Sequence, residues 1–263
     1  MGIIFDKCPF KIINMSSFRP QGFNILPLVT KNLLIINGLV FFASITFQNI
    51  FNYDVNAELG LYYVGSNQFM PIQIITYMFL HGSFNHLLFN MFAFWMFGAA
   101  VENYWGPKRF LFYYLATGIG AALIQQFVSF IRIESLTASM DSESLQQMFQ
   151  NGEMILRGGQ NYIGTLGDIN LLYNIPTVGA SGSVFGILLA FGMLFPNSLI
   201  YIYFMIPVKA KWLVMGYGAL ELYSGFANNP GDNVAHFAHL GGMLFGFILI
   251  KYWKKNDNSF NMY

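Results

Sequence analysis

Hydrophobic residues occur along the chain in long runs that are separated by shorter polar stretches. An apolar run of about 20 residues is long enough for a helix to cross the hydrocarbon core of a membrane. The pattern predicts an all-α, polytopic membrane protein with six spans. We expect these spans at residues 33–51, 85–104, 110–131, 178–195, 212–226 and 234–252.

Two of the connecting segments are long enough to carry structure of their own. Residues 52–80 are rich in aromatic side chains and contain Pro71, which favours a segment at the membrane interface over a further span. Residues 132–176 are polar and acidic. We expect this second segment outside the membrane, with a short helix near residues 142–155.

The composition agrees with a membrane protein. Hydrophobic residues make up 55% of the chain and charged residues only 10%, against roughly 25% charged in soluble domains. The mean hydropathy is +0.49. A net charge of +1 gives no reason to expect binding to nucleic acid. The single cysteine, Cys8, cannot form a disulfide within the chain.

The basic residues predict the orientation of the spans. With the N-terminus inside, eleven of the thirteen Lys and Arg residues lie on the inner side, and only Arg132 and Arg157 lie outside. This bias indicates an N-in/C-in topology. The composition favours a bacterial plasma (inner) membrane. We therefore expect a cytoplasmic tail at 1–30, a six-span domain at 31–253 with an extracytoplasmic insertion at 132–176, and a cytoplasmic tail at 254–263.

Four polar side chains from three spans are expected in one layer near the outer surface. Ser181 lies within about one turn of the outer end of the fourth span, and His86 and Asn90 lie near the outer end of the second. His239 lies about 7–8 Å below the start of the sixth span, at 1.5 Å per residue. Such groups are costly in a membrane and indicate a functional site.

These residue types fit nucleophilic catalysis. A serine hydroxyl needs a nearby base, and His239 can take the proton from Ser181 and return it to a leaving amine. His86 and Asn90 share a helix face and could stabilise an oxyanion together with the Ser181 N–H. We see no acidic residue at the depth of His239, so the sequence favours a Ser–His dyad over a triad. Taken alone, the Ser181 stretch also fits a packing motif with a capping serine.

Small residues flank the serine and the histidine. Gly182 and Gly186 are four apart in the fourth span, and Gly242 and Gly246 are four apart in the sixth. Small residues at this spacing allow helices to approach closely in lipid. We expect the two glycine faces to pack against each other and bring Ser181 to its partner histidine.

Three motifs in three predicted spans resemble those of the rhomboid family of intramembrane serine proteases. The motifs are His86-x-x-x-Asn90, Gly179-x-Ser181-Gly182 and Ala238-His239-x-x-Gly242-x-x-x-Gly246. The resemblance covers about residues 33–252. It implies a six-transmembrane-helix rhomboid-like bundle of the bacterial type.

The resemblance also implies roles for individual residues. Ser181 would be the nucleophile and His239 the general base, while His86 and Asn90 would act as oxyanion-hole donors. Phe185 would pack against the catalytic imidazole. The glycines of the motifs would support the site: Gly179, Gly182, Gly242 and Gly246. Like the family, the protein would need no metal or cofactor, and it would cleave single-span membrane proteins near the outer boundary of the lipid bilayer.

The resemblance carries two further expectations for the loops. Substrate would enter past the fifth span and the loop before the sixth, about residues 224–233. Many members carry Trp-Arg in the first outer loop where this chain has Pro71-Ile72-Gln73. This departure leaves the anchoring of that loop open, and the Ser–His pair is unaffected by it.

Other interpretations stay open from the sequence. A non-proteolytic relative that binds membrane clients is one, and a small transporter or channel is another, although neither internal repeats nor broken midplane helices are visible. His236 and His239 are three apart, as in a helical metal pair, but no carboxylate joins the histidines of this layer in the sequence pattern. Glu221 in the fifth span fits either a structural hydrogen-bond partner or a gate element.

Overall fold

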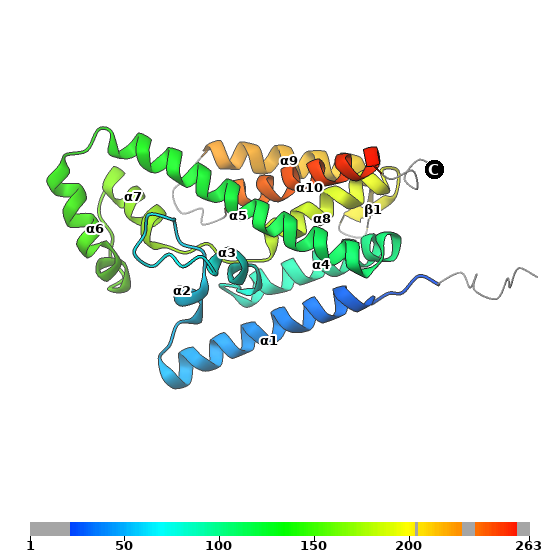
Figure 1. Ribbon diagram of the computed structural model, residues 1–263, viewed down its shortest axis with the longest axis horizontal. Coiled ribbons are helices and arrows are strands. Elements are labelled where there is room, and N and C mark those ends of the chain that lie inside the picture. The colour runs from blue at the N-terminus through cyan, green and yellow to red at the C-terminus, as the bar shows by residue number, and fades with distance from the viewer. Residues whose placement is uncertain (1–21, 203–204, 228–234, 257–263) are drawn as a thin grey trace, which may run out of the picture.

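The computed structural model describes residues 22–202, 205–227 and 235–256. Within these ranges the chain is almost entirely helical, with one short β-hairpin (Figure 1). The elements are α1 (Leu28–Phe51), α2 (Val55–Leu59), α3 (Gln73–Thr76), the 3-10 helix η1 (Tyr77–Phe79), α4 (Phe84–Trp105), α5 (Pro107–Thr137), α6 (Ser142–Arg157), α7 (Thr165–Asn174), α8 (Ser181–Leu194), β1 (Leu199–Ile202), β2 (Ile206–Lys209), α9 (Ala210–Ala227) and α10 (His236–Asn256).

The six expected spans correspond to α1, α4, α5, α8, α9 and α10, with ends that differ by a few residues. By length and composition, α1, α4 and α5 are each able to cross a membrane, and α8 is a shorter apolar helix of 14 residues. Large apolar side chains also cover much of the outer surface, including Leu39 and Phe89, as expected where a bundle faces lipid. The prediction of a polytopic helical membrane bundle is confirmed.

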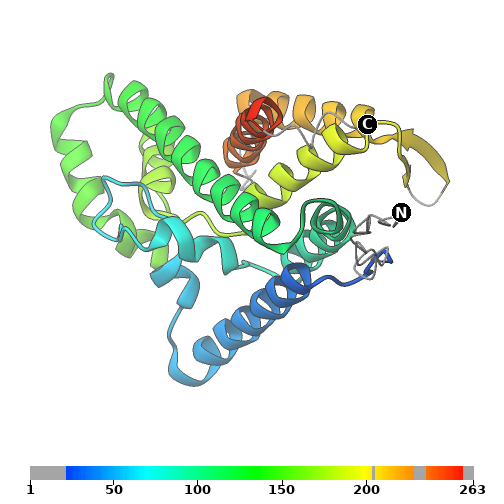
Figure 2. The same cartoon turned by 45° about the vertical axis from the view of Figure 1, so that its right-hand side comes forward.

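Helix α8 lies at the centre of the bundle. It packs against α4, α5, α9 and α10, and α10 also packs against α5. Figures 1 and 2 show α1 along one edge of this bundle, with α6 and α7 beyond the far end of α5. The central position explains why α8 is rich in small residues, since it meets neighbouring helices on most of its faces.

Glycines bring the backbones of α8 and α10 into direct contact. A Cβ atom on Gly242 would lie 1.9 Å from the carbonyl oxygen of Gly182. The expected pairing of two glycine faces is nevertheless only partly correct. Gly182 and Gly186 present their Cα hydrogens to α5, where added Cβ atoms would meet Ala121 at 2.5 Å and Thr117 at 2.7 Å. The serine helix is therefore packed closely on two sides.

Residues 52–80, expected as the first outer loop, are anchored by Gln73, which is fully buried. Its side-chain amide donates to the carbonyl oxygens of Glu58 and Gln68, at 3.1 and 2.9 Å, and its side-chain oxygen accepts from the N–H of Met70 at 3.1 Å. One neutral amide thus ties together three points of the loop. These hydrogen bonds anchor the loop in the absence of the Trp-Arg pair.

A second buried polar side chain connects the start of α1 to α4. The carboxylate of Glu102 accepts hydrogen bonds from the backbone N–H groups of Val29 and Thr30, at 2.9 and 2.7 Å, and from the Thr30 hydroxyl at 2.8 Å. The first N–H groups of a helix lack intrahelical partners and favour negative charge. Glu102 therefore caps a helix that is distant in sequence.

The segment before the serine helix is more structured than expected. Helix α5 has 31 residues, about 46 Å at 1.5 Å per residue, so it extends beyond a hydrocarbon core of about 30 Å. Helix α6 follows it and confirms the short helix expected near residues 142–155, while α7 was not predicted. The connection between α8 and α9 also contains an unpredicted hairpin, in which Leu199 pairs with Lys209.

The backbone contact between α8 and α10 leads to a stability prediction. Gly242→Ala should lower the free energy of unfolding by at least about 2 kcal/mol, because the added methyl group overlaps a backbone carbonyl that cannot move independently. The measurement is the midpoint of thermal unfolding in one fixed detergent.

Gly216→Ala on α9 is the matched control, since an added Cβ there would meet no atom within 4 Å. Alanine is the better helix former by about 1 kcal/mol, so this variant should be unchanged or slightly more stable. Equal midpoints for the two variants would contradict the close contact.

Candidate active site

Ser181 is the first residue of α8, and the backbone before it has an unusual conformation. Gly179 has a φ of +133°, which L side chains rarely adopt. Its N–H donates to the carbonyl oxygen of Tyr77 at 2.9 Å. An added Cβ on Gly179 would also lie 2.9 Å from His86 Nε2. Glycine is therefore required twice, for the turn that directs Ser181 and for the close approach of His86.

The structure brings Ser181 and His239 together. His239 Nε2 lies 2.8 Å from Ser181 Oγ, and His239 is buried in α10 with 8% of its surface exposed. Phe185, one turn after the serine, stacks on the imidazole with ring centroids 4.2 Å apart and planes inclined by 8°. The aromatic contact expected from the resemblance is present, and it restricts the plane of the imidazole.

A carboxylate contacts the other nitrogen of the same imidazole. His239 Nδ1 lies 2.9 Å from Glu221 Oε2, and His236 Nδ1 lies 2.6 Å from the same oxygen. An ionised carboxylate can only accept, so His239 Nδ1 carries the proton and Nε2 is free to accept from the Ser181 hydroxyl. The imidazole is therefore in the tautomer that a general base requires.

The expectation that no acidic residue lies near His239 is wrong. That expectation compared depths only among helices that enter from the outer side. Glu221 belongs to α9, which runs in the opposite direction in the expected topology, so its expected depth must be counted from the far end of the helix. Glu221 and Glu102 are the only acidic residues within the six predicted spans. Buried charges need partners, and this signal could have paired Glu221 with a histidine.

His86 and Asn90 are placed differently from each other. His86 is half-buried, and its Nε2 faces the Cα of Gly179, two residues before Ser181. Asn90 is buried and its amide donates to the carbonyl oxygen of His86, in its own helix, at 3.0 Å. His86 thus lies beside the serine, whereas the Asn90 amide is bonded within α4. Their action on an oxyanion stays a prediction.

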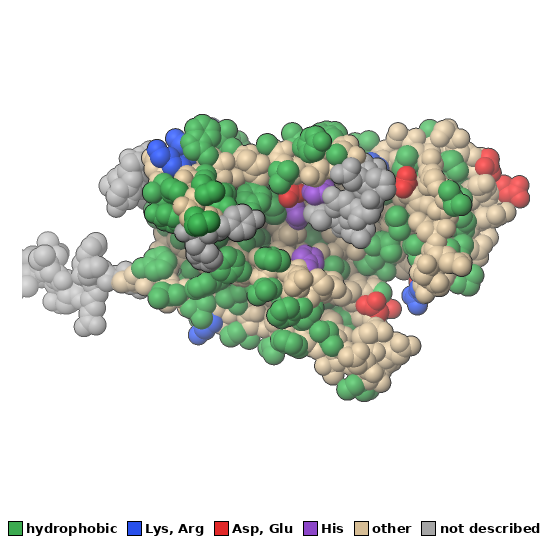
Figure 3. Space-filling view, turned by 180° about the vertical axis from the view of Figure 1, so that it is seen from behind, with side chains coloured by type: hydrophobic (Ala, Val, Ile, Leu, Met, Phe, Trp, Pro, Cys, Tyr) green, Lys and Arg blue, Asp and Glu red, His purple; other side chains and the backbone are tan. Residues whose placement is uncertain are grey.

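The histidines reach one face of the molecule. Figure 3 shows histidine side chains between hydrophobic side chains on this face, with an acidic side chain next to some of the histidines. Residues 228–233 of the expected entry region lie outside the described residues. The buried ring of His81 packs edge-on against His86, with centroids 5.0 Å apart.

Three of these side chains also have the chemistry of a metal site. Glu221, His236 and His239 each offer one ligand atom, and these atoms lie within 4.8 Å of one another. Two imidazoles and a carboxylate are common zinc ligands. In the structure, however, Nδ1 of each histidine is already hydrogen-bonded to Oε2 of Glu221.

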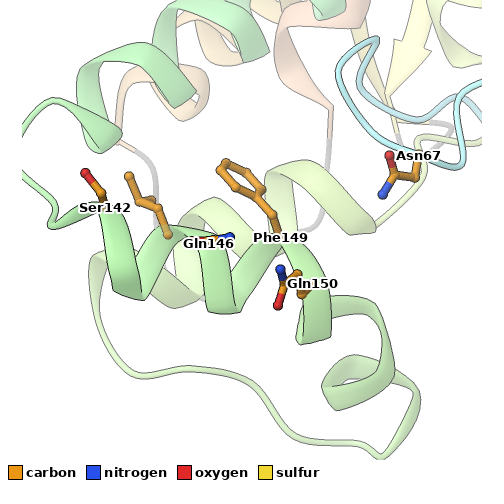
Figure 4. Close-up of a pocket in the computed structure, with 6 residues that line it drawn as sticks. Asn67, Ser142, Gln146, Phe149 and Gln150 are labelled. Atoms are coloured by element: carbon orange, nitrogen blue, oxygen red, sulfur yellow. The ribbon is translucent and has the colours of Figure 1, made fainter.

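A separate cavity of about 550 Å³ lies along α6, away from the residues described above (Figure 4). Phe149 and three polar side chains of α6 line it, and Asn67 of the first outer loop closes one side. None of the motif residues contributes to its lining.

Comparison with known proteins identifies the family. The family model of the rhomboid domain matches residues 68–255. The chain therefore belongs to the rhomboid family, whose domain is a polytopic helical membrane bundle. The match includes every residue of the three motifs.

Individual relatives are more distant. The chain is 25% identical to Rhomboid protease AarA of Providencia stuartii over 240 residues, which cover 84% of this chain and 70% of AarA. It is 26% identical to the Putative rhomboid protease YdcA of Bacillus subtilis, over 67% of this chain and 64% of that protein. It is 28% identical to RHOMBOID-like protein 12, mitochondrial, of Arabidopsis thaliana, over 64% of this chain. The chain spans about half or less of the length of the first three curated relatives, at 42%, 40% and 51%.

The burial of His81 leads to a prediction on pH. Burial, with the nearby His86 as a smaller contribution, lowers the pKa of His81 from 6.5 to about 4. The unfolded chain therefore binds more protons between these values, so stability is retained above about pH 6.5 and lost as the pH falls toward 4. The midpoint of thermal unfolding should fall more steeply over this range in the native protein than in His81→Gln. Parallel curves would show that His81 does not contribute.

Proposed function

We propose that this protein is an intramembrane serine endopeptidase that cleaves transmembrane segments of membrane proteins near the outer face of the membrane. The observation that carries the proposal is the 2.8 Å contact between Ser181 Oγ and His239 Nε2. Membership of the rhomboid family supports it, as do the names of AarA and YdcA. Ser181 is the nucleophile and His239 the general base.

The reaction proceeds through an acyl-enzyme. His239 Nε2 accepts the Ser181 hydroxyl proton as Oγ attacks the carbonyl carbon of the scissile peptide bond. The tetrahedral intermediate collapses when the imidazolium returns this proton to the leaving amine. A water molecule then repeats the sequence on the serine ester, which releases the second product and restores the hydroxyl.

The negative charge of the intermediate is stabilised at the start of α8. The Ser181 N–H belongs to the first turn of the helix, where N–H groups lack intrahelical acceptors. His86 Nε2, beside Gly179, is the second donor. Asn90 contributes as a third donor if its amide turns from the His86 carbonyl toward the substrate.

The substrates are single-span membrane proteins. Peptide hydrolysis needs an extended segment and water, so cleavage favours small residues and weak helical structure near the outer boundary of the bilayer. The protein lies in the plasma membrane with both termini inside and the site toward the extracytoplasmic side, which is the orientation that the basic residues favour. No metal or cofactor takes part in this mechanism.

A serine-directed probe tests the nucleophile. A fluorophosphonate should label the native protein in detergent, and Ser181→Ala should abolish labelling because no other serine hydroxyl of the described residues is hydrogen-bonded to an imidazole. His239→Ala should reduce the labelling rate by at least about a hundredfold, since the hydroxyl loses its proton acceptor. Labelling is measured by gel fluorescence and by mass spectrometry of the modified peptide.

Ser183→Ala is the matched control. Ser183 lies on the same helix, but it is buried and its hydroxyl donates to the Tyr114 carbonyl at 2.8 Å, so its loss should leave labelling intact. Absence of labelling in a folded native protein would contradict the proposal and favour a relative that binds membrane clients without cutting them. Labelling that persists in Ser181→Ala would reject the nucleophile assignment.

A further inference from the structure

Glu221 is a buried carboxylate near the middle of α9, with 8% of its surface exposed. A charge in this position is costly unless it is paired and hydrogen-bonded. Its Oε2 accepts from Nδ1 of both His236 and His239, which lie three residues apart on the facing side of α10. Among the described residues, the hydrogen bonds of this carboxylate therefore lead to the two histidines.

Two glycines hold α9 close to α10 on either side of Glu221. Gly218 lies three residues before it and Gly225 four residues after it, so the three residues share one helix face. A Cβ on Gly225 would lie 3.1 Å from the ring of Phe237, and one on Gly218 would lie 3.3 Å from Met243 Cε. The close packing limits how far the carboxylate can move relative to α10.

The imidazole of His239 is thus restrained by side chains from two other helices. Ser181 and Phe185 of α8 contact one ring nitrogen and one ring face. Glu221 of α9 contacts the opposite nitrogen. Rotation of the imidazole would break the carboxylate contact and the serine contact together, so the two hydrogen bonds select the same orientation.

We propose that Glu221 is a positioning residue, which extends the Ser181–His239 pair to a three-residue array held together by α8, α9 and α10. The inference rests on the proposed function, since it concerns the base of that reaction. Glu221 touches neither the substrate nor the reacting atoms. It keeps the proton on His239 Nδ1, so that Nε2 receives the serine proton.

The carboxylate also changes the energy of the charged intermediate. When His239 accepts the serine proton, it becomes an imidazolium next to the negative charge of Glu221. An opposite charge at hydrogen-bond distance stabilises the protonated imidazole. Among the described residues, the titratable groups that face His239 are Glu221 from α9, His236 from its own helix and His86 from α4. Glu221 is the negatively charged one among them.

His236 holds the carboxylate from the other side. It donates to the same oxygen at 2.6 Å, and its ring lies nearly perpendicular to that of His239, at 86° and 6.3 Å between centroids. This second hydrogen bond fixes the carboxylate at the level of the base. His236 is therefore a support for Glu221 and has no contact with Ser181 among the hydrogen bonds of the described residues.

The test uses the rate of fluorophosphonate labelling as a function of probe concentration. Glu221→Gln keeps the size of the side chain and removes its charge. The maximal labelling rate should fall about a hundredfold, with the half-saturating probe concentration nearly unchanged. Glu221→Asp should recover part of the rate, because it restores the negative charge near the imidazole.

Glu102→Gln is the matched control for a merely structural role. Glu102 is the other buried carboxylate of the bundle, but it caps α1 and does not contact His239. This variant should lose stability and keep the native maximal labelling rate in its folded fraction. His236→Gln, which removes one support of the carboxylate, should lower the maximal rate less than Glu221→Gln does.

The outcomes separate this inference from the proposed function. If the native protein and Ser181→Ala are equally unlabelled, the proposed function fails. If the native protein is labelled at Ser181 and Glu221→Gln matches its maximal labelling rate, the positioning role alone is overturned. A loss of native labelling after chelation that added zinc restores would also overturn it, and would assign the Glu221, His236 and His239 cluster to a metal ion instead.

Discussion

The backbone contact between Gly182 and Gly242 determines the geometry of the whole site. A carbonyl of α8 lies where a side chain of α10 would begin, so the two helices approach as closely as their backbones allow. Small residues permit such contacts in lipid, where packing replaces the hydrophobic effect as the force between helices. Ser181 precedes one of these glycines and His239 lies three residues before the other. Their 2.8 Å contact is therefore a consequence of helix packing.

Buried carboxylates connect elements that the apolar contacts leave loosely defined. Glu102 holds the start of α1 against α4, and Glu221 holds α9 against two histidines of α10. Each carboxylate would be costly in an apolar bundle without its donors. The same cost makes each contact selective, because a helix arrangement that separated a carboxylate from its donors would leave a buried charge without hydrogen bonds. Gln73 has a comparable role in the first outer loop without carrying a charge.

The local parts of this architecture could be predicted well. Hydrophobic runs indicated all six helices that match the expected spans, since a span must satisfy its own backbone and needs a minimum apolar length. The motifs around Ser181 and His239 were visible because polar residues are rare in spans. The outer loop and the hairpin after α8 were less predictable, since aromatic and apolar residues at an interface have no single periodicity. The prediction that Gly186 packs against α10 was also wrong, because one glycine pattern is compatible with several neighbouring helices.

By itself, the sequence determined which segments form the apolar helices of the membrane bundle and which polar residues these helices carry, and it favours one orientation of the spans. These properties depend on composition, charge and distance along a helix, and each can be read along a single span. Only the tertiary structure decided that Glu221 meets His236 and His239, and that Asn90 bonds within its own helix. Such contacts depend on the rotation and depth of separate helices. A one-dimensional pattern does not specify these two quantities, because packing against all neighbours sets them at once.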